Sequence, residues 1–352
     1  DYARTWATNA VTLDSNGNNF QGNPDTYTVD YDTVGQSLNI VYADSTKGWL
    51  PVSDDAVAFD HGDPPTQKGL FAYGSTGGKV SLKNLISSSG VVASDVTGVG
   101  TARHQLAAAS YGGDKAIFGY GSTSSKVGMT NLVNNSGVVG ADVTRVGTAR
   151  DNLAAANYGG DKVIFGFGYT GSAQSSVTNL VNNSGVVGSD VTGVGTVRNA
   201  LGAAGYGGDK AIFGFGTPGP TGVTNLVSNT GVVSSDTAAV GTARDYIAAA
   251  KYGGDKAIFA YGQVSGGTVS SLKNLVSNSG VVASDVSGVG TARYGPAATG
   301  YGGDKAIFGF GNTGSVTGVT NLVNSSGVVA ADVSAVGTAR GVPAAAGYSL
   351  SA

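Results

Sequence analysis

Two acidic side chains are the first candidates for chemistry in this chain of 352 residues. Asp151 and Asp245 each follow a repeated arginine, at a position that the other copies of an internal repeat fill with non-acidic residues. Hydrolysis of a glycosidic bond needs two carboxyl groups about 5 to 10 Å apart, one of them with a raised pKa. The two aspartates lie two repeats apart and no further catalytic group accompanies them. We therefore expect no enzyme, with a secreted polysaccharide-acting enzyme as an alternative.

Charged residues also recur in every copy of the repeat. Six arginines end a Gly-Thr-Ala/Val-Arg element, and six aspartates occupy one later position. Rings of like charge could bind an anionic ligand, but residues identical in every copy are more simply explained as ion pairs within or between repeats. We expect a structural role for them. They are Arg103, Arg150, Arg198, Arg244, Arg293 and Arg340, and Asp95, Asp142, Asp190, Asp236, Asp285 and Asp332.

The sequence contains no pattern typical of a metal site. His61 and His104 show no ligand spacing, and there is no cysteine for a thiolate site or a disulfide. The Tyr-Gly-Gly-Asp segments combine the residues of calcium-binding β-rolls but lack their nine-residue period. We interpret these segments as turns and both histidines as surface residues, and we expect no metal and no cofactor.

An internal repeat positions all of these residues. The segment Ala116–Gly121 recurs with small changes from Gly69, Val163, Ala211, Ala257 and Ala306, at spacings of 47, 47, 48, 46 and 49 residues. A period of about 40 to 50 residues is typical of a four-stranded propeller blade. Glycine is abundant, at 59 residues, and all 23 acidic residues are aspartate. This composition favours turns over helices. The sequence predicts an all-β, six-bladed propeller.

Each repeat contains four apolar runs that we interpret as strands. The first is Leu106–Ala109, which ends at the turn Tyr111–Asp114, and the second is Lys115–Gly121. The third and fourth are clearest in the next copy, as Val177–Asn182 and Val186–Arg198. The small alanines of the first strand suit the crowded centre of a propeller.

Alternation along the second strand predicts how blades pack. It places Phe118 and Tyr120 on one face, and Gly119 and Gly121 on the other. We expect the aromatic side chains of one blade to pack onto the glycine face of its neighbour.

The two ends of the repeat array are complementary. The array begins at a second strand, Lys68–Gly74, and ends with Arg340–Tyr348, which matches a first strand. We expect the C-terminal tail to complete the first blade and close the ring, because closure removes free sheet edges.

The order of arginine, alanine run, Tyr-Gly-Gly-Asp turn and Ile-Phe-Gly strand resembles kelch-type propeller repeats. The resemblance covers residues 69–352, about four-fifths of the chain. It differs from the kelch pattern because no doubled glycine follows the second strand and neither Trp6 nor Trp49 lies in a repeat. The resemblance implies a β-propeller fold.

Two sets of positions differ between repeats, and in an up-and-down blade both emerge on the same side. One is the link between the second and third strands, and the other is the pair of residues after each arginine. Loops on a rigid scaffold commonly carry recognition, so we interpret this variable face as a ligand-binding surface, with neutral drift as the alternative. The candidate residues are His104, Gln105, Asp151, Asn152, Tyr169, Asn199, Asp245, Tyr246, Gln263, Tyr294 and Asn312.

Residues 1–60 lack the repeat and predict a small β module. Short alternating runs at Thr26–Val29 and Ser37–Tyr42 indicate strands. Residues 61–68, with two adjacent prolines, predict an extended linker to a domain that spans residues 69–352.

The segment Gln36–Tyr42 followed by Ser45–Val52 resembles a short module of bacteriophage fibre and virion proteins. The resemblance implies a trimeric connector that attaches a distal domain to a particle. Asp1 is not a methionine, so we expect processing or further residues upstream.

Charge and hydropathy limit the partners. A net charge of −3 and the absence of a basic stripe argue against nucleic acid. No apolar run approaches the roughly 20 residues that cross a bilayer, so we expect no membrane insertion. The leading hypothesis is a non-enzymatic, extracellular virion surface protein, a phage fibre or decoration subunit, that binds a host-surface glycan or protein. A purely structural coat or filament subunit is the alternative.

Overall fold

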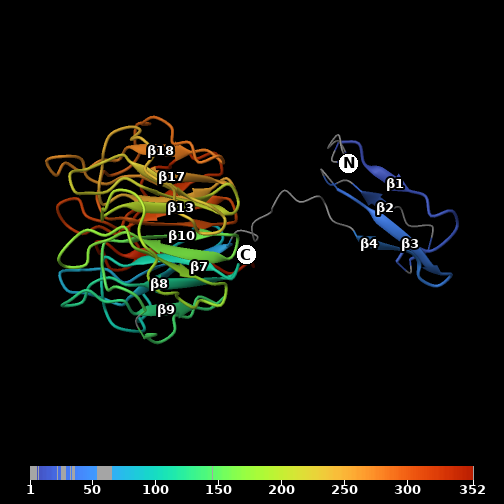
Figure 1. The fold of residues 1–352 in the computed structure, drawn as a ribbon, viewed down its shortest axis with the longest axis horizontal. Coiled ribbons are helices and arrows are strands. Elements are labelled where there is room, and N and C mark those ends of the chain that lie inside the picture. The colour runs from blue at the N-terminus through green and yellow to red at the C-terminus, as the bar shows by residue number, and fades with distance from the viewer. Residues whose placement is uncertain are drawn as a thin grey trace. The chain divides into compact units, whose positions relative to one another are not determined.

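The computed structural model describes residues 6, 8–21, 23, 24, 29–31, 33, 36–53, 66–144 and 146–351. The chain divides into two compact units, Asp1–His61 and Gly62–Ala352 (Figure 1). Every regular element among the described residues is a β-strand. The predicted linker, residues 61–68, lies mostly outside the described residues, and its last residue already belongs to a strand.

The first unit contains two antiparallel strand pairs. Strand β1 (Val11–Leu13) pairs with β2 (Val29–Tyr31), and β3 (Asn39–Asp44) pairs with β4 (Gly48–Ser53). The predicted run Ser37–Tyr42 overlaps β3. The run Thr26–Val29 meets β2 at its last residue, and its first three residues lie outside the described residues.

The second unit contains six three-stranded antiparallel sheets, each with its second strand in the middle. The sheets are β22 (Ala344–Tyr348), β5 (Lys68–Ala72) and β6 (Lys83–Ile86); β7 (Ala107–Tyr111), β8 (Lys115–Gly119) and β9 (Thr130–Val133); β10 (Ala154–Tyr158), β11 (Lys162–Gly166) and β12 (Thr178–Val181); β13 (Gly202–Tyr206), β14 (Lys210–Gly214) and β15 (Thr224–Val227); β16 (Ala248–Tyr252), β17 (Lys256–Ala260) and β18 (Lys273–Val276); and β19 (Ala297–Tyr301), β20 (Lys305–Gly309) and β21 (Thr320–Val323).

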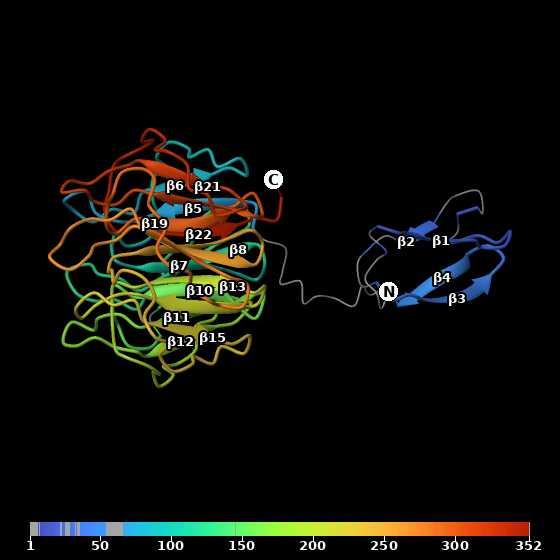
Figure 2. The same ribbon diagram turned by 90° about the horizontal axis from the view of Figure 1, so that it is seen from above.

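The first strands of the six sheets contact one another in chain order. Strand β7 contacts β10, the series continues through β13, β16 and β19, and β22 contacts both β19 and β7. Figures 1 and 2 show the sheets of this unit packed against one another. The prediction that the C-terminal tail completes the first repeat is confirmed, because β22 pairs with β5 from Ala344 opposite Ala72 to Tyr348 opposite Lys68.

The predicted fourth strand is not formed as a regular strand. The segment predicted as Val186–Arg198 meets β12 only at isolated bridges. The side-chain amide of Asn179, within β12, donates to the carbonyl oxygen of Gly188 at 3.1 Å and to Oδ1 of Asp190 at 2.9 Å. Side-chain bonds of this kind compete with the backbone ladder, and their equivalents occur in all six repeats.

The second prediction that fails is the shared face of Phe118 and Tyr120. Phe118 packs against Tyr73 of the preceding sheet at 5.6 Å between ring centroids, and Tyr120 packs against Phe165 of the following sheet at 5.2 Å. Tyr120 has a φ of 64°, so the alternation of the strand ends at Gly119. The glycine contact itself is present, because a Cβ on Gly119 would lie 2.8 Å from the Phe165 ring.

The repeated arginines join neighbouring sheets, as expected for a structural role. Arg103 is fully buried, and its guanidinium lies 4.4 Å from the centroid of Tyr73 in the preceding sheet. In its own sheet, Nη2 donates to Oδ1 of Asn131 at 2.7 Å. The other five arginines make the same two contacts with equivalent residues.

The repeated aspartates hold the loops that carry the arginines. Asp142 accepts hydrogen bonds from the backbone and hydroxyl of Thr101 and from Asn131. Burial alone would raise the pKa of Asp142, but these bonds and the charge of Arg103 lower it. The equivalent bond from Thr338 to Asp95 joins the last repeat to the first.

The Tyr-Gly-Gly-Asp turns form a cyclic series of backbone hydrogen bonds, which we call the turn ring. The first glycine of each turn donates to the aspartate carbonyl of the next turn, at 2.6 to 2.9 Å. In the first sheet, which has no such turn, Gln67 supplies the acceptor and Ser349 the donor. The series therefore returns to its start through residues from both ends of the unit.

Candidate ligand-binding face

The two sets of variable positions meet at the opposite end of the first strands from the turn ring. In each sheet, the residue after the repeated arginine forms an antiparallel bridge with the first residue of the link between the second and third strands. The pairs are His104 with Ser122, Asp151 with Tyr169, Asn199 with Thr217, Asp245 with Gln263, Tyr294 with Asn312, and Gly341 with Ser75.

The second residue after each arginine belongs to another cyclic series of backbone hydrogen bonds, which we call the cap ring. Each N–H donates to the carbonyl oxygen of the equivalent residue in the preceding repeat, at 2.7 to 3.2 Å, and the sixth bond returns to the first residue. All six residues have φ between 44 and 58°. The members are Gln105, Asn152, Ala200, Tyr246, Gly295 and Val342.

Backbone bonding explains why the cap ring tolerates different residues. A main-chain N–H and C=O are present whatever the side chain. The left-handed conformation costs roughly 1 to 2 kcal/mol for residues other than glycine, yet five of the six members are not glycine. The repeat thus keeps a strained backbone here while the side chains change, which is typical of functional sites.

Asp151 and Asp245, the two aspartates first considered for catalysis, differ sharply in environment. Asp151 is fully buried and ion-paired with Lys126, whose ammonium lies 5.4 Å from the centroid of the Tyr169 ring. Its carboxylate is therefore engaged within the protein. Asp245 is half-buried, and its Oδ1 has no hydrogen-bond partner among the described residues. Burial raises the pKa of Asp245 to about 6.

A second unsatisfied acceptor lies one repeat away. Oδ1 of Asn199 is buried and lacks a donor within the described part of the chain. A buried polar atom without a partner costs about 1 to 3 kcal/mol. Two such atoms at equivalent positions of adjacent repeats, Asn199 and Asp245, distinguish this sector of the face from the others.

Two aromatic side chains complete the same sector. The rings of Tyr246 and Tyr294 pack edge to face at 5.7 Å between centroids, and both residues are half-buried. Burial, followed by the negative charges of Asp245 and Asp151, raises the pKa of Tyr246. Tyrosine rings provide apolar contact surface, and amide and carboxyl oxygens accept hydrogen bonds from hydroxyl groups.

Other predicted site residues organise their own loops. Nε2 of Gln263 donates to the carbonyl of Gly267 at 3.0 Å, and the hydroxyl of Tyr169 donates to the carbonyl of Gly171 at 2.9 Å. Oδ1 of Asn312 accepts from the backbone of Gly314. The side-chain amide of Asn152 donates to Asp151 at 3.4 Å. His104, which we interpreted as a surface residue, is half-buried, and burial lowers its pKa. His61 lies outside the described residues.

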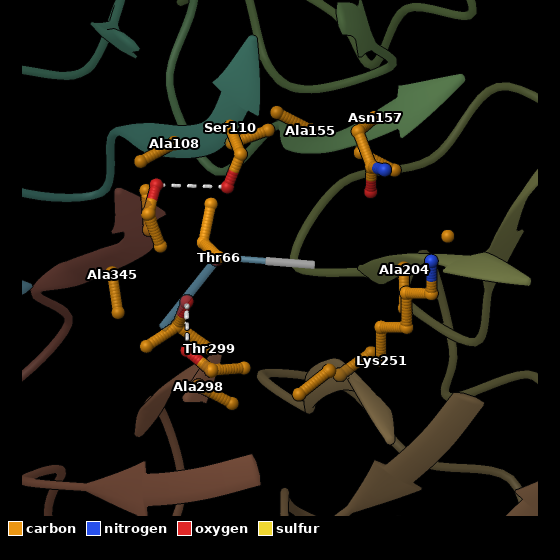
Figure 3. Close-up of a pocket in the computed structure, with 18 of the residues that line it drawn as sticks. Thr66, Ala108, Ser110, Ala155, Asn157, Ala204, Lys251, Ala298, Thr299 and Ala345 are labelled. Carbon is orange, nitrogen blue, oxygen red and sulfur yellow. Dashed lines mark hydrogen bonds between the residues drawn. The ribbon is translucent and has the colours of Figure 1, made fainter. Parts of the chain in front are cut away.

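Sequence reasoning missed a third variable position, which lies near the turn ring. The residue before the tyrosine that ends each first strand differs between repeats although its neighbours are nearly constant, and this contrast is visible in the sequence. These residues line a cavity of about 100 Å³ between the six first strands (Figure 3). They are Ser110, Asn157, Gly205, Lys251, Gly300 and Gly347.

No protein-family model and no curated protein matches this chain. Within the described ranges, no group of three or more histidine and aspartate side chains is placed to hold a metal ion. The described residues also contain no helix long and apolar enough to span a membrane.

Proposed function

We propose that residues 69–352 form a closed six-bladed β-propeller of kelch-like type. The proposal is supported by the contacts of β22 with both β19 and β7, and by the pairing of β22 with β5. The cap ring and the turn ring add cyclic hydrogen bonding at both ends of the first strands. A closed arrangement satisfies sheet edges that an open one would leave unpaired.

We further propose that this domain is a non-enzymatic binding protein whose variable face engages a host-surface glycan or protein. One observation carries the proposal, namely the sector that combines the Tyr246–Tyr294 ring pair with the unsatisfied acceptors of Asn199 and Asp245. Aromatic faces beside hydrogen-bonding oxygens suit a polyhydroxylated ligand or a tyrosine-rich protein contact. The ion pair between Asp151 and Lys126 argues against a catalytic carboxyl pair.

The direction of the chain supports a role at the distal end of a particle. In the turn ring, the backbone N–H of Gln67 donates to Ser349, and its carbonyl oxygen accepts from Gly302. The chain therefore enters the domain at the end opposite the variable face. The variable face, at the other end, stays accessible when the residues before Gln67 are attached to another protein.

The proposed attachment is to other proteins of a virion, through residues 1–60 as a trimeric connector. It rests on the resemblance of the segment 36–52 to phage fibre modules. It is supported by β3, which is exposed along its whole length in the single chain and presents Ile40, Val41 and Tyr42 at 37, 49 and 41% exposure. Association between copies would remove this apolar surface from water.

The test is binding of the full chain to host cells and to glycan arrays. Tyr246→Ala combined with Tyr294→Ala should weaken binding by about tenfold or more, because hot-spot aromatic residues typically contribute 2 kcal/mol or more. Ser136→Ala, on an exposed turn beside the opposite end, should leave binding unchanged. Absence of saturable binding, or equal binding by the double variant, would refute the proposal.

A structural coat or filament subunit is the second candidate function, and one observation favours it. The first valine after each third-strand turn is 55 to 66% exposed in every repeat. These residues are Val91, Val138, Val186, Val232, Val281 and Val328. Lateral packing of copies would bury them, so cryo-electron microscopy of the assembly should show contacts through these valines and no free variable face.

A further inference from the structure

The cavity between the first strands has one side that is already filled. Figure 3 shows Thr66 extending into the cavity near Ser110. A Cβ on Gly347 would lie 2.0 Å from Oγ1 of Thr66, so the threonine occupies the space above this glycine. The hydroxyl of Ser110 donates to the carbonyl of Gly347 at 2.9 Å. The Ser110 hydroxyl on this side is therefore satisfied by the protein.

The other side contains two polar side chains that the protein does not satisfy. Asn157 on β10 and Lys251 on β16 flank β13, which presents Gly205 between them. A Cβ on Gly205 would lie 2.6 Å from Oδ1 of Asn157, so the amide extends across the glycine. Figure 3 shows Asn157 and Lys251 directed into the same sector of the cavity. Neither side chain has a hydrogen bond to any described residue.

Among the described residues, the ammonium group of Lys251 has no ion-pair partner. Asp255, the acidic group that acts on it electrostatically, already pairs with Lys256 at 3.1 Å. Desolvation lowers the pKa of Lys251, as expected for an amine enclosed by alanine side chains and glycine backbone. Enclosing a cation without a partner is costly, and a bound anion would offset that cost.

The size and walls of the cavity restrict the anion. Its volume of about 100 Å³ has room for a few heavy atoms. The two free polar side chains can donate to two oxygen atoms, and the alanine side chains around them suit a short apolar substituent. A carboxylate carries both features in one small molecule.

We propose that this cavity binds a small carboxylate, with its oxygen atoms accepting hydrogen bonds from the ammonium of Lys251 and the amide of Asn157. The site lies at the end of the first strands opposite the variable face. It is therefore independent of the proposed binding to a host surface.

The experiment is a titration of the full chain with formate and with acetate, followed by calorimetry and by NMR of the lysine side-chain nitrogen. Saturable binding is expected below about 100 mM, where a site with a millimolar Kd is filled. The pKa of Lys251 should rise when the carboxylate is bound, because an opposite charge favours the ammonium form.

Two variants and one control make the test specific. Lys251→Met removes the charge, and Gly205→Ala displaces the Asn157 amide while keeping the charge; each should weaken binding about tenfold or more. Lys115→Met, at the position equivalent to Lys256 in another repeat and outside the cavity lining, should bind as the wild type does. The proposal is overturned if a folded wild-type chain shows no saturable binding, or if both variants bind as tightly as the wild type.

Discussion

In the second unit, both ends of the first strands are held by a cyclic series of backbone hydrogen bonds, but the sequence is nearly constant at one end and variable at the other. The turn ring is built from nearly constant Tyr-Gly-Gly-Asp segments, whereas the cap ring is built from Gln105, Asn152, Ala200, Tyr246, Gly295 and Val342. Both rings use only main-chain bonds. The contrast in sequence must therefore arise from what surrounds each ring.

Close contacts between neighbouring sheets account for the constant end. A Cβ on Gly112, in the turn of the second repeat, would lie 2.8 Å from the carbonyl oxygen of Asn183 in the third. In the same interface, a Cβ on Gly185 would lie 2.9 Å from the ring of Tyr111. The two constant turns thus interlock and tolerate no side chain. At the cap ring, a Cβ on Gly295 would lie 2.6 Å from a side-chain methyl group of Val342, so the closest neighbour there is a side chain that itself differs between repeats, and only the backbone needs to be constant.

Removing the C-terminal tail would interrupt the cap ring and the turn ring together, and it should have the largest effect on stability. Deletion of residues 342–352 eliminates β22, one member of the cap ring and the Ser349 link of the turn ring. We expect the deletion to lower the free energy of unfolding by more than about 5 kcal/mol, which is the whole stability of many domains. The cooperative unfolding transition should therefore be lost. Circular dichroism during urea denaturation measures it.

Deletion of residues 350–352 alone is the control, because it spares β22 and Ser349. A cooperative transition of wild-type midpoint in the longer deletion would show that neither ring needs to be complete.

A side chain at the interlocked turns should have the next largest effect. Gly231→Ala introduces a Cβ at 2.9 Å from the ring of Tyr158 and forces alanine to a φ of 83°. We expect the free energy of unfolding to fall by about 2 to 3 kcal/mol. Gly219→Ala is the matched control at the variable end, where φ is 61° and no atom lies within 4 Å of the new Cβ. Its cost should be about 1 kcal/mol, and equal losses at both sites would contradict the steric explanation.

Proton binding should distinguish the two ends by the sign of the pH dependence. Burial raises the pKa of Asp245, at the cap end, to about 6, so the folded state binds more protons than the unfolded state between about pH 4 and 6. Its contribution to stability is therefore lost as the pH rises through about 6. At the turn end, the hydrogen bond from Lys115 lowers the pKa of Asp114, and that contribution is lost as the pH falls.

Chemical denaturation across about pH 2.5 to 7.5 measures both effects. Asp245→Asn should remove part of the decline in unfolding free energy at the higher pH values, relative to wild type. Asp114→Asn should change the free energy of unfolding only at the acidic end of this range. An unchanged slope in Asp245→Asn would show that this carboxyl does not titrate in the folded protein as the structure indicates.

Glycine in the cap ring should have the smallest effect. Ala200 has a φ of 53°, which glycine adopts without strain, and the substitution removes only one buried methyl group. The two terms oppose each other, so we expect a change of less than about 1 kcal/mol in the free energy of unfolding. Thermal and urea unfolding measure it, and a large loss would mean that the cap ring depends on its side chains after all.

The sheet content and the order of the sheets were predictable from the sequence. The recurrence of the Ala116–Gly121 segment identified six repeats, and the unmatched ends predicted that Arg340–Tyr348 pairs with the first of them. The up-and-down order of the strands was enough to predict that the two variable sets lie on the same side of the repeats. These features follow from local periodicity and connectivity, which a sequence displays directly.

The contacts between repeats could be seen only in the folded structure. Left-handed backbone at Tyr120 redirected an aromatic ring, and the Asn179 side chain replaced a fourth strand. Asp151 pairs with Lys126, which lies in the link of the preceding repeat. Lys251 and Asn157 lie on either side of Gly205 in the cavity. These contacts join residues far apart in the chain or depend on a single φ angle. Packing between sheets fixes both, and no alternation of residue types encodes them.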